Sequence, residues 1–321
     1  MLKFDCPSCG NSLFFNNQWC LGCGTAVNFS PQALNFIPAE GSHDCANRVS
    51  NGVCNWQADA GSDLCRSCAL NEIIPDLSVE GNQEKWGMLE EAKRRLLFSC
   101  LRLGISLDGV SFRFLANTPG SSVMTGHADG VITINLDEAD PAAREATRQS
   151  MDEKYRTLVG HFRHEFGHYY WDQHVASDPD ALARCRQLFG DERIDYQASL
   201  QEHYATKGDG ADDVSLAHVS EYAQVHPWED WAETFAHYLH MRDVLETAEE
   251  FGLAPRSVGG DFNFERGLLE WQRLSVAFNE INRSMGHHDL YPFTISSAIA
   301  EKLEFIHSLV STAPRVFQHQ F

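Results

Sequence analysis

The segment from His161 to Trp171 contains the pattern H-E-x-x-H, whose residue types and spacing suit metal-assisted hydrolysis. Residues four apart lie on one face of an α-helix, so His164 and His168 can direct two imidazole nitrogens at one tetrahedral Zn²⁺. Glu165 would then reach a water at the metal and act as its base. The alternative is a helix whose histidines only satisfy polar partners in a core.

The helix that carries this pattern must be held in place by its other face. Apolar residues recur with helical spacing and predict a stripe that packs against the core, while the histidine face opens to a cleft. The stripe consists of Tyr155, Leu158, Val159, Phe162, Phe166, Tyr169 and Tyr170. His161 lies one turn before His164, where it either contacts substrate or only lines the cleft.

A zinc ion held by two histidines and a water lacks one protein ligand, which a second helix should supply. The segment from His226 to Glu233 is the best candidate, because Pro227 suits the first helical position. Glu229 lies in the first turn, where the helix dipole favours an ionised carboxylate, and we expect it to bind the metal. Glu233, one turn later, would accept a hydrogen bond from a ligand histidine. The alternative is that both glutamates only complement the helix dipole.

Eight of the ten cysteines fall between residues 6 and 68 and include C-x-x-C pairs that are typical of thiolate zinc sites. The predicted first site consists of Cys6, Cys9, Cys20 and Cys23, and the predicted second site of Cys45, Cys54, Cys65 and Cys68. His43 could replace one thiolate of the second site. Because no export signal precedes them, metal binding is favoured over disulfides. Cys100 and Cys185 stand alone and are expected to be buried.

Composition and net charge indicate a globular protein and disfavour some classes of partner. The chain has 321 residues, 43% hydrophobic and 22% charged, which is ordinary for a globular protein. The amino terminus shows no signal region and no long apolar run exists, so we expect a cytoplasmic protein. The net charge of −20 disfavours nucleic acid and membrane surfaces as partners. The acidic first 80 residues suit contact with a protein partner instead.

Further elements follow from periodicity and turn residues. Residues 82–103 predict an amphipathic helix that ends at Gly104. Two strands are predicted at 110–115 and 131–136, and the second is either an ordinary strand or an open edge that takes up a peptide. After the histidine helix, further helices are predicted at 179–189, 192–206, 212–225, 228–251, 262–285 and 294–312.

Nearly the whole chain resembles the bacterial zinc-binding metallopeptidases that carry an amino-terminal zinc ribbon. The resemblance rests on the ribbon cysteines and on the motifs at 74–77, 92–97, 160–171, 189–193 and 226–233. It implies a zinc-dependent hydrolase without implying a substrate.

Short segments also resemble the gluzincin-type protease domain of anthrax lethal factor. The H-E-F-G-H segment is matched by residues 164–168, and the later E-x-x-A-E segment by residues 229–233. This resemblance implies that Glu229 binds zinc and that Tyr222, seven residues earlier, assists at the transition state.

The sequence therefore predicts an α+β protein in three parts. These are a zinc ribbon at 1–30, a second Cys₄ zinc module at 40–78, and a mostly helical, zincin-like catalytic domain with a short β-sheet at 82–321. One catalytic and two structural Zn²⁺ ions are expected.

The predicted activity is hydrolysis of peptide bonds, with Glu165 as general base and Tyr222 or His226 as donor to the oxyanion. The rival functions are an adaptor with a non-catalytic zincin domain and a zinc amidase that acts on a non-peptide substrate.

Overall fold

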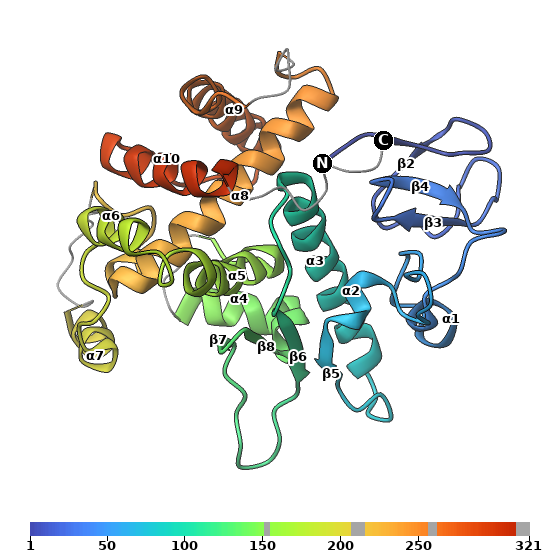
Figure 1. The fold of residues 1–321 in the computed structure, drawn as a ribbon, viewed down its shortest axis with the longest axis horizontal. Coiled ribbons are helices and arrows are strands. Elements are labelled where there is room, and N and C mark those ends of the chain that lie inside the picture. The colour runs from blue at the N-terminus through green and yellow to red at the C-terminus, as the bar shows by residue number, and fades with distance from the viewer. Residues whose placement is uncertain (151–154, 207–215, 256–261, 313–321) are drawn as a thin grey trace. The chain divides into compact units, whose positions relative to one another are not determined.

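The computed structural model describes residues 1–150, 155–206, 216–255 and 262–312 (Figure 1). These residues form two compact units. The first contains residues 1–147 and 157–162, and the second contains the described parts of 148–156 and 163–312. Both Cys₄ modules thus belong to the same compact unit as the helix and strands that follow them.

Short strands and helices frame the cysteine-rich region of the first unit. The strands are β1 (Phe4–Asp5), β2 (Ser12–Leu13), β3 (Val27–Ser30) and β4 (Asn35–Pro38), and the helices are α1 (Ala46–Asn51) and α2 (Arg66–Ala69). The strands pair antiparallel as β1 with β2 and β3 with β4. Strands of two to four residues cannot build a core alone, so other contacts must hold this region together.

An aromatic cluster supplies that core. The ring centroids of Phe29 lie 5.3 Å from Phe15 and 5.2 Å from Trp56, and Phe98 lies 5.2 Å from Phe15. Phe15 comes from the first module, Trp56 from the second, and Phe98 from helix α3 (Asn82–Leu103). All of these rings are buried, so the two zinc modules and α3 share one hydrophobic core.

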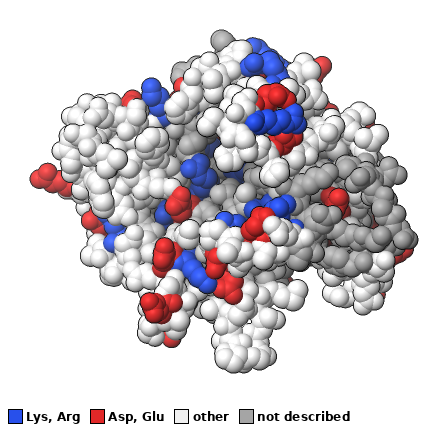
Figure 2. Space-filling view, turned by 180° about the vertical axis from the view of Figure 1, so that it is seen from behind, with Lys and Arg blue, Asp and Glu red and all other residues white. Residues whose placement is uncertain are grey.

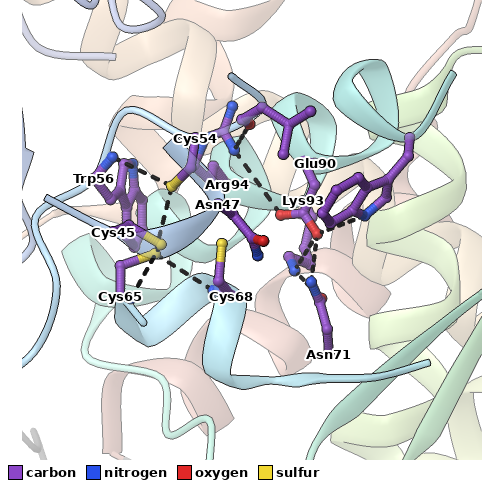
Figure 3. Close-up of polar contacts among 12 residues, drawn as sticks. Cys45, Asn47, Cys54, Trp56, Cys65, Cys68, Asn71, Glu90, Lys93 and Arg94 are labelled. Atoms are coloured by element: carbon purple, nitrogen blue, oxygen red, sulfur yellow. Dashed lines mark hydrogen bonds and ion pairs between the residues drawn. The ribbon is translucent and has the colours of Figure 1, made fainter. Parts of the chain in front are cut away.

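Helix α3 forms as predicted and ends at Gly104, whose φ of 73° suits a left-handed C-cap. Apolar side chains of this amphipathic helix, such as Trp86 and Leu89, are buried, but so are Glu90 and Lys93, whose charged groups are 2.9 Å apart. The Lys93 ammonium also contacts the Asn71 side chain, and Glu90 accepts hydrogen bonds from Asn71 and Trp86. Figure 3 shows this network beside the second cysteine cluster. Arg94, on the same helix as the network, connects it to the cysteine cluster. Its Nη1 donates a hydrogen bond to the carbonyl of Val53 at 2.7 Å, one residue before Cys54.

A four-stranded sheet completes the first unit, in the order β5-β6-β8-β7. Its strands are β5 (Asn71–Ile73), β6 (Ser111–Leu115), β7 (Gly126–Ala128) and β8 (Val131–Asn135). Both predicted strands are confirmed, as β6 and β8. Strand β8 pairs parallel with β6 and antiparallel with β7, so it is an ordinary strand, and the alternative of an open edge that takes up a peptide is wrong. A 3-10 helix, η1 (Leu136–Ala139), and helix α4 (Pro141–Ser150) follow.

The second unit is helical. It contains most of α5 (Leu158–His174), then α6 (Pro179–Phe189), α7 (Tyr196–Thr206), the 3-10 helix η2 (Tyr222–Gln224), α8 (Pro227–Glu250), α9 (Phe264–Ser284) and α10 (Ser297–Thr312). The helix predicted at 212–225 is wrong where the structure describes it, because residues 216–221 form turns and bends and only η2 is helical. Residues 212–215 of that prediction lie outside the described residues. The α+β class is confirmed.

Basic and acidic side chains are interspersed on the face that Figure 2 shows. Several basic groups form salt bridges, such as Arg186 with Glu192 at 2.5 Å and Lys85 with Asp137 at 2.8 Å. Partly exposed pairs of this kind each contribute about 1 kcal/mol or less. Among the described helices, none is both long and apolar enough to cross a membrane.

Candidate metal centre

Helices α5 and α8 approach closely at the middle of the H-E-x-x-H segment. A Cβ atom added to Gly167 would lie 3.1 Å from the Cα of Ala232 and 3.2 Å from the Cβ of Phe235, closer than most Cβ contacts in packed proteins. The indole of Trp231 also donates a hydrogen bond to the Gly167 carbonyl at 2.9 Å. A glycine between the two histidines therefore lets α8 come near enough to face them.

Three potential ligand atoms converge between these helices. The Nε2 atom of His164 lies 3.2 Å from Nε2 of His168 and 3.0 Å from Oε2 of Glu229, and the last two atoms are 3.5 Å apart. Ligands about 2.0–2.1 Å from a tetrahedral zinc are about 3.3–3.4 Å from one another. The triangle of Nε2, Nε2 and Oε2 atoms therefore fits one zinc ion.

Glu233 fixes which nitrogen of His164 faces the other two atoms. His164 Nδ1 lies 2.7 Å from Oε1 of Glu233, whose Oε2 accepts a hydrogen bond from the Ser220 hydroxyl at 2.6 Å. Because an ionised carboxylate can only accept, Nδ1 is the donor, and Nε2 is the nitrogen that has a free lone pair whenever the ring is neutral. The lone pair on Nε2 of His164 points toward a carboxylate and a second imidazole, an arrangement that favours a bound cation. The carboxylate beside this nitrogen belongs to Glu229 and not to Glu233.

The charges in this site favour a cation at the same place. Burial alone would raise the pKa of Glu229, but His168 and His164 hold that pKa well below its usual range. Burial opposes a charge on His164, yet Glu229 and Glu233 together raise its pKa well above normal. The carboxylate thus stays ionised, which is the form that a zinc ligand requires.

Helix α8 begins so that Glu229 falls in its first turn. Its N-cap is His226, whose Nδ1 accepts a hydrogen bond from the backbone N–H of Trp228 at 3.1 Å. The other ring nitrogen, Nε2, lies 3.2 Å from the carbonyl of Ile194. Both nitrogens are thus engaged within the protein, and this arrangement does not support the oxyanion role expected for His226.

Two tyrosines complete the surroundings of Glu229. Tyr222, in η2, places its ring 5.9 Å from the His164 ring. Tyr196, the first residue of α7, donates a hydrogen bond to Oε1 of Glu229 at 2.8 Å, and its oxygen lies 3.4 Å from that of Tyr222. Burial and the charge of Glu229 raise the pKa of both phenols, so both keep their protons.

Glu165 and His161 occupy different settings on α5. Glu165 is buried, and its charge also acts to raise the pKa of Tyr196, after burial and the charge of Glu229. The Nδ1 atom of His161 lies 3.0 Å from Oε2 of Glu138, within the first unit. A contact of His161 with substrate stays a prediction.

Sequence reasoning missed Tyr196 and Ser220. Both act on a glutamate of α8 from positions 33 and 13 residues away in the chain. Neither lies at a spacing that points to the metal, and a tyrosine or serine alone carries no ligand signal. The only hint was that Tyr196 closely follows the family motif at 189–193.

The two cysteine sets each gather at one point. In the first, Cys6 and Cys23 have sulfur atoms 3.8 Å apart, and those of Cys9 and Cys20 are 3.7 Å apart. In the second, the sulfurs of Cys54 and Cys65 are 3.6 Å apart. Sulfurs about 2.3 Å from a tetrahedral zinc are about 3.8 Å from one another, so both sets fit the metal.

None of these cysteines forms a disulfide. The second set is buried, whereas Cys9 and Cys23 of the first set are exposed. His43 is largely exposed and is not among the four ligand candidates of the second set. Cys100 and Cys185 are buried, as predicted.

Comparison with known proteins agrees with these sites. Residues 82–309 match the family described as "Putative zinc-binding metallo-peptidase", and residues 3–79 match a zinc-ribbon domain that spans both cysteine sets. Proteins of Mycobacterium bovis and Mycobacterium tuberculosis, both named as uncharacterized, are 41% identical over 337 residues, which cover 99% of this chain and 98% of theirs. No solved structure matches the chain. The resemblance of short motifs to lethal factor stays a prediction.

The family model covers more than two thirds of the chain and includes the three convergent ligand atoms as well as Glu165. The chain therefore belongs to the zinc-binding metallo-peptidase family and carries an amino-terminal zinc-ribbon domain.

Proposed function

We propose that this protein is a zinc-dependent peptidase that hydrolyses peptide bonds with Glu165 as its general base. The observation that carries the proposal is the convergence of His164 Nε2, His168 Nε2 and Glu229 Oε2 beside a buried glutamate. Three protein ligands leave a fourth position of a tetrahedral zinc open, as in catalytic rather than structural zinc sites.

His164, His168 and Glu229 would hold the ion, and Glu233 would keep His164 in the tautomer that can bind it. When bound, zinc supplies Lewis acidity that polarises a carbonyl group and lowers the pKa of a water. A structural site needs no base, so Glu165 between the two histidines favours an enzyme over an adaptor.

The remaining chemistry falls to side chains of the second unit. Glu165 takes the proton of the attacking water and passes it to the nitrogen of the leaving amine. Tyr222 keeps its proton because burial and nearby glutamates raise its pKa, so its hydroxyl is a donor to the oxyanion that develops on the carbonyl oxygen. The two Cys₄ sites would bind structural zinc. The metal would stabilise this region, whose strands are too short to form a stable fold alone.

The test uses the zinc-loaded protein and a mixture of synthetic peptides, with products identified by mass spectrometry. We expect cleavage that a chelator abolishes and added zinc restores, and that His164→Ala lacks. Cleavage of non-peptide amides without cleavage of any peptide would favour the amidase. Full zinc occupancy without hydrolysis of either class would favour the adaptor.

A further inference from the structure

Tyr196 contacts the metal-binding carboxylate on the side away from the histidines. Its hydroxyl is 2.8 Å from Oε1 of Glu229, whereas Oε2 of the same carboxylate is 3.0 Å from His164 Nε2. The two oxygens of Glu229 therefore have separate partners, one a phenol and the other the cation site.

Contacts with neighbouring residues hold Tyr196 in place. Asp195 accepts a hydrogen bond from the backbone N–H of Ala198 at 2.9 Å, which caps α7 and puts Tyr196 in its first turn. His226 lies against the carbonyl of Ile194 at 3.2 Å, and its ring centroid is 5.3 Å from that of Tyr196. His226 thus ties the start of α7 to the start of α8, where Glu229 lies.

The direction of the hydrogen bonds follows from counting protons. A tyrosine hydroxyl has one proton, and an ionised carboxylate can only accept, so Tyr196 donates its proton to Glu229. The Tyr196 oxygen can then only accept from Tyr222, which lies 3.4 Å away. That separation is longer than the usual 2.7–2.8 Å or so of an O–H···O bond, so Tyr222 is the more loosely held of the two phenols.

We propose that Tyr196 is a positioning residue that makes Glu229 a one-oxygen ligand and gives the hydroxyl of Tyr222 an acceptor at rest. This inference rests on the proposed function. The hydrogen bond from Tyr196 holds Oε1 toward the phenol and away from the metal, so the site keeps four ligands including the water. Tyr222 can turn to the oxyanion while the stronger Tyr196–Glu229 bond stays in place.

Cobalt in place of zinc at the histidine site reports the number of metal ligands directly, because the visible absorption of Co²⁺ weakens when its coordination number rises above four. Protein with two zinc ions per chain, after mild chelation, is titrated with Co²⁺. In Tyr196→Phe we expect weaker visible absorption than in the parent, because Oε1 of Glu229 is released toward the metal. Zinc affinity at the same site should fall about 10- to 100-fold, the usual loss for such a partner.

Tyr222→Phe is the matched control, because it also removes one phenol oxygen, whose hydrogen-bond partner is the Tyr196 hydroxyl, whereas Tyr196 is the phenol bonded to Glu229. It should keep the cobalt spectrum of the parent. An unchanged spectrum in Tyr196→Phe, or the same change in both variants, would overturn the inference. Cobalt-edge X-ray absorption of the parent is a second measurement that needs no variant, and two carboxylate oxygens at the metal would contradict it.

The outcomes also separate the inference from the proposed function. If the parent takes up no Co²⁺ beyond its thiolate sites, both fail. If the parent binds Co²⁺ and hydrolyses peptides but Tyr196→Phe matches it, only the role of Tyr196 fails.

Discussion

Glu233 Oε1 lies 2.7 Å from His164 Nδ1, one helical turn beyond the glutamate that faces the histidine Nε2 atoms. The two glutamates of α8 thus have different partners although they share one helix face. Glu229 faces the site of the cation, and Glu233 orients one of its histidines.

Substitution of each glutamate should reveal that difference. Glu229→Ala removes a ligand and should leave the histidine site without zinc, whereas Glu233→Ala should weaken zinc binding about 10- to 100-fold. Competition with a chromophoric chelator measures both. Glu265, exposed in the first turn of α9, provides the control Glu265→Ala, which should bind zinc like the parent. Equal losses in the two α8 variants would contradict the assignment.

Elemental analysis of the parent protein should give three zinc ions per chain, and Glu229→Ala should give two. Each of the three clusters supplies three or four ligand atoms that fit one ion. Thiol titration in denaturant without reductant should detect all ten cysteines. Fewer than two zinc ions, or a disulfide within the first set, would overturn the zinc-ribbon interpretation.

The buried pair in α3 should be costly to break on one side only. Lys93→Met removes the nearer cation from the buried Glu90 and leaves only Arg94, 3.9 Å away, so it should lower the free energy of unfolding by up to about 3–5 kcal/mol. Glu90→Gln together with Lys93→Met should recover most of this loss, because the amide oxygen can still accept from Trp86 and Asn71 without a charge. Urea unfolding measures both. A double variant as unstable as Lys93→Met would show that the charge is not the cause.

Acid should destabilise the second unit through His237. Burial lowers the pKa of this histidine to about 4, although the charge of Glu233 opposes the shift. The unfolded chain, with a pKa of about 6.5, takes up a proton first as the pH falls. The stability that neutral His237 supplies is therefore complete above about pH 6.5 and falls by about 3 kcal/mol by pH 4.

Urea unfolding between pH 7 and pH 4.5 tests this prediction. His237→Gln should lose less stability across that range than the parent. The exposed His288 offers the control His288→Gln, which should follow the parent. If His237→Gln and the parent lose stability equally, His237 is not the group responsible.

The sequence allowed prediction of the parts of the site that lie close together in the chain. His164 and His168 are one turn apart, as are Glu229 and Glu233, so helix geometry alone puts each pair on one face. The C-x-x-C pairs are local for the same reason. The strands at β6 and β8 could be recognised because buried and outward residues alternate along them.

The missed features depend on contacts between distant segments. Tyr196 and Ser220 reach α8 from other elements, and nothing in their own neighbourhoods marks them. The burial of Lys93 could not be predicted from the spacing of apolar residues. Its ammonium group is buried because Glu90, Asn71 and an aromatic ring of the sheet surround it. The sequence left two alternatives for β8, an ordinary strand or an open edge, because its neighbour β7 has only three residues and carries too short a pattern to recognise.

The most direct test of the proposed function compares the parent with Glu165→Gln on one cleaved peptide. Glutamine keeps the shape of the side chain and lacks the basic oxygen, so zinc content should be unchanged at three ions while the rate of hydrolysis falls about 10²- to 10⁴-fold. A Glu165→Gln protein that holds the same zinc and cleaves the peptide at the parental rate would contradict the assignment of Glu165 as the general base.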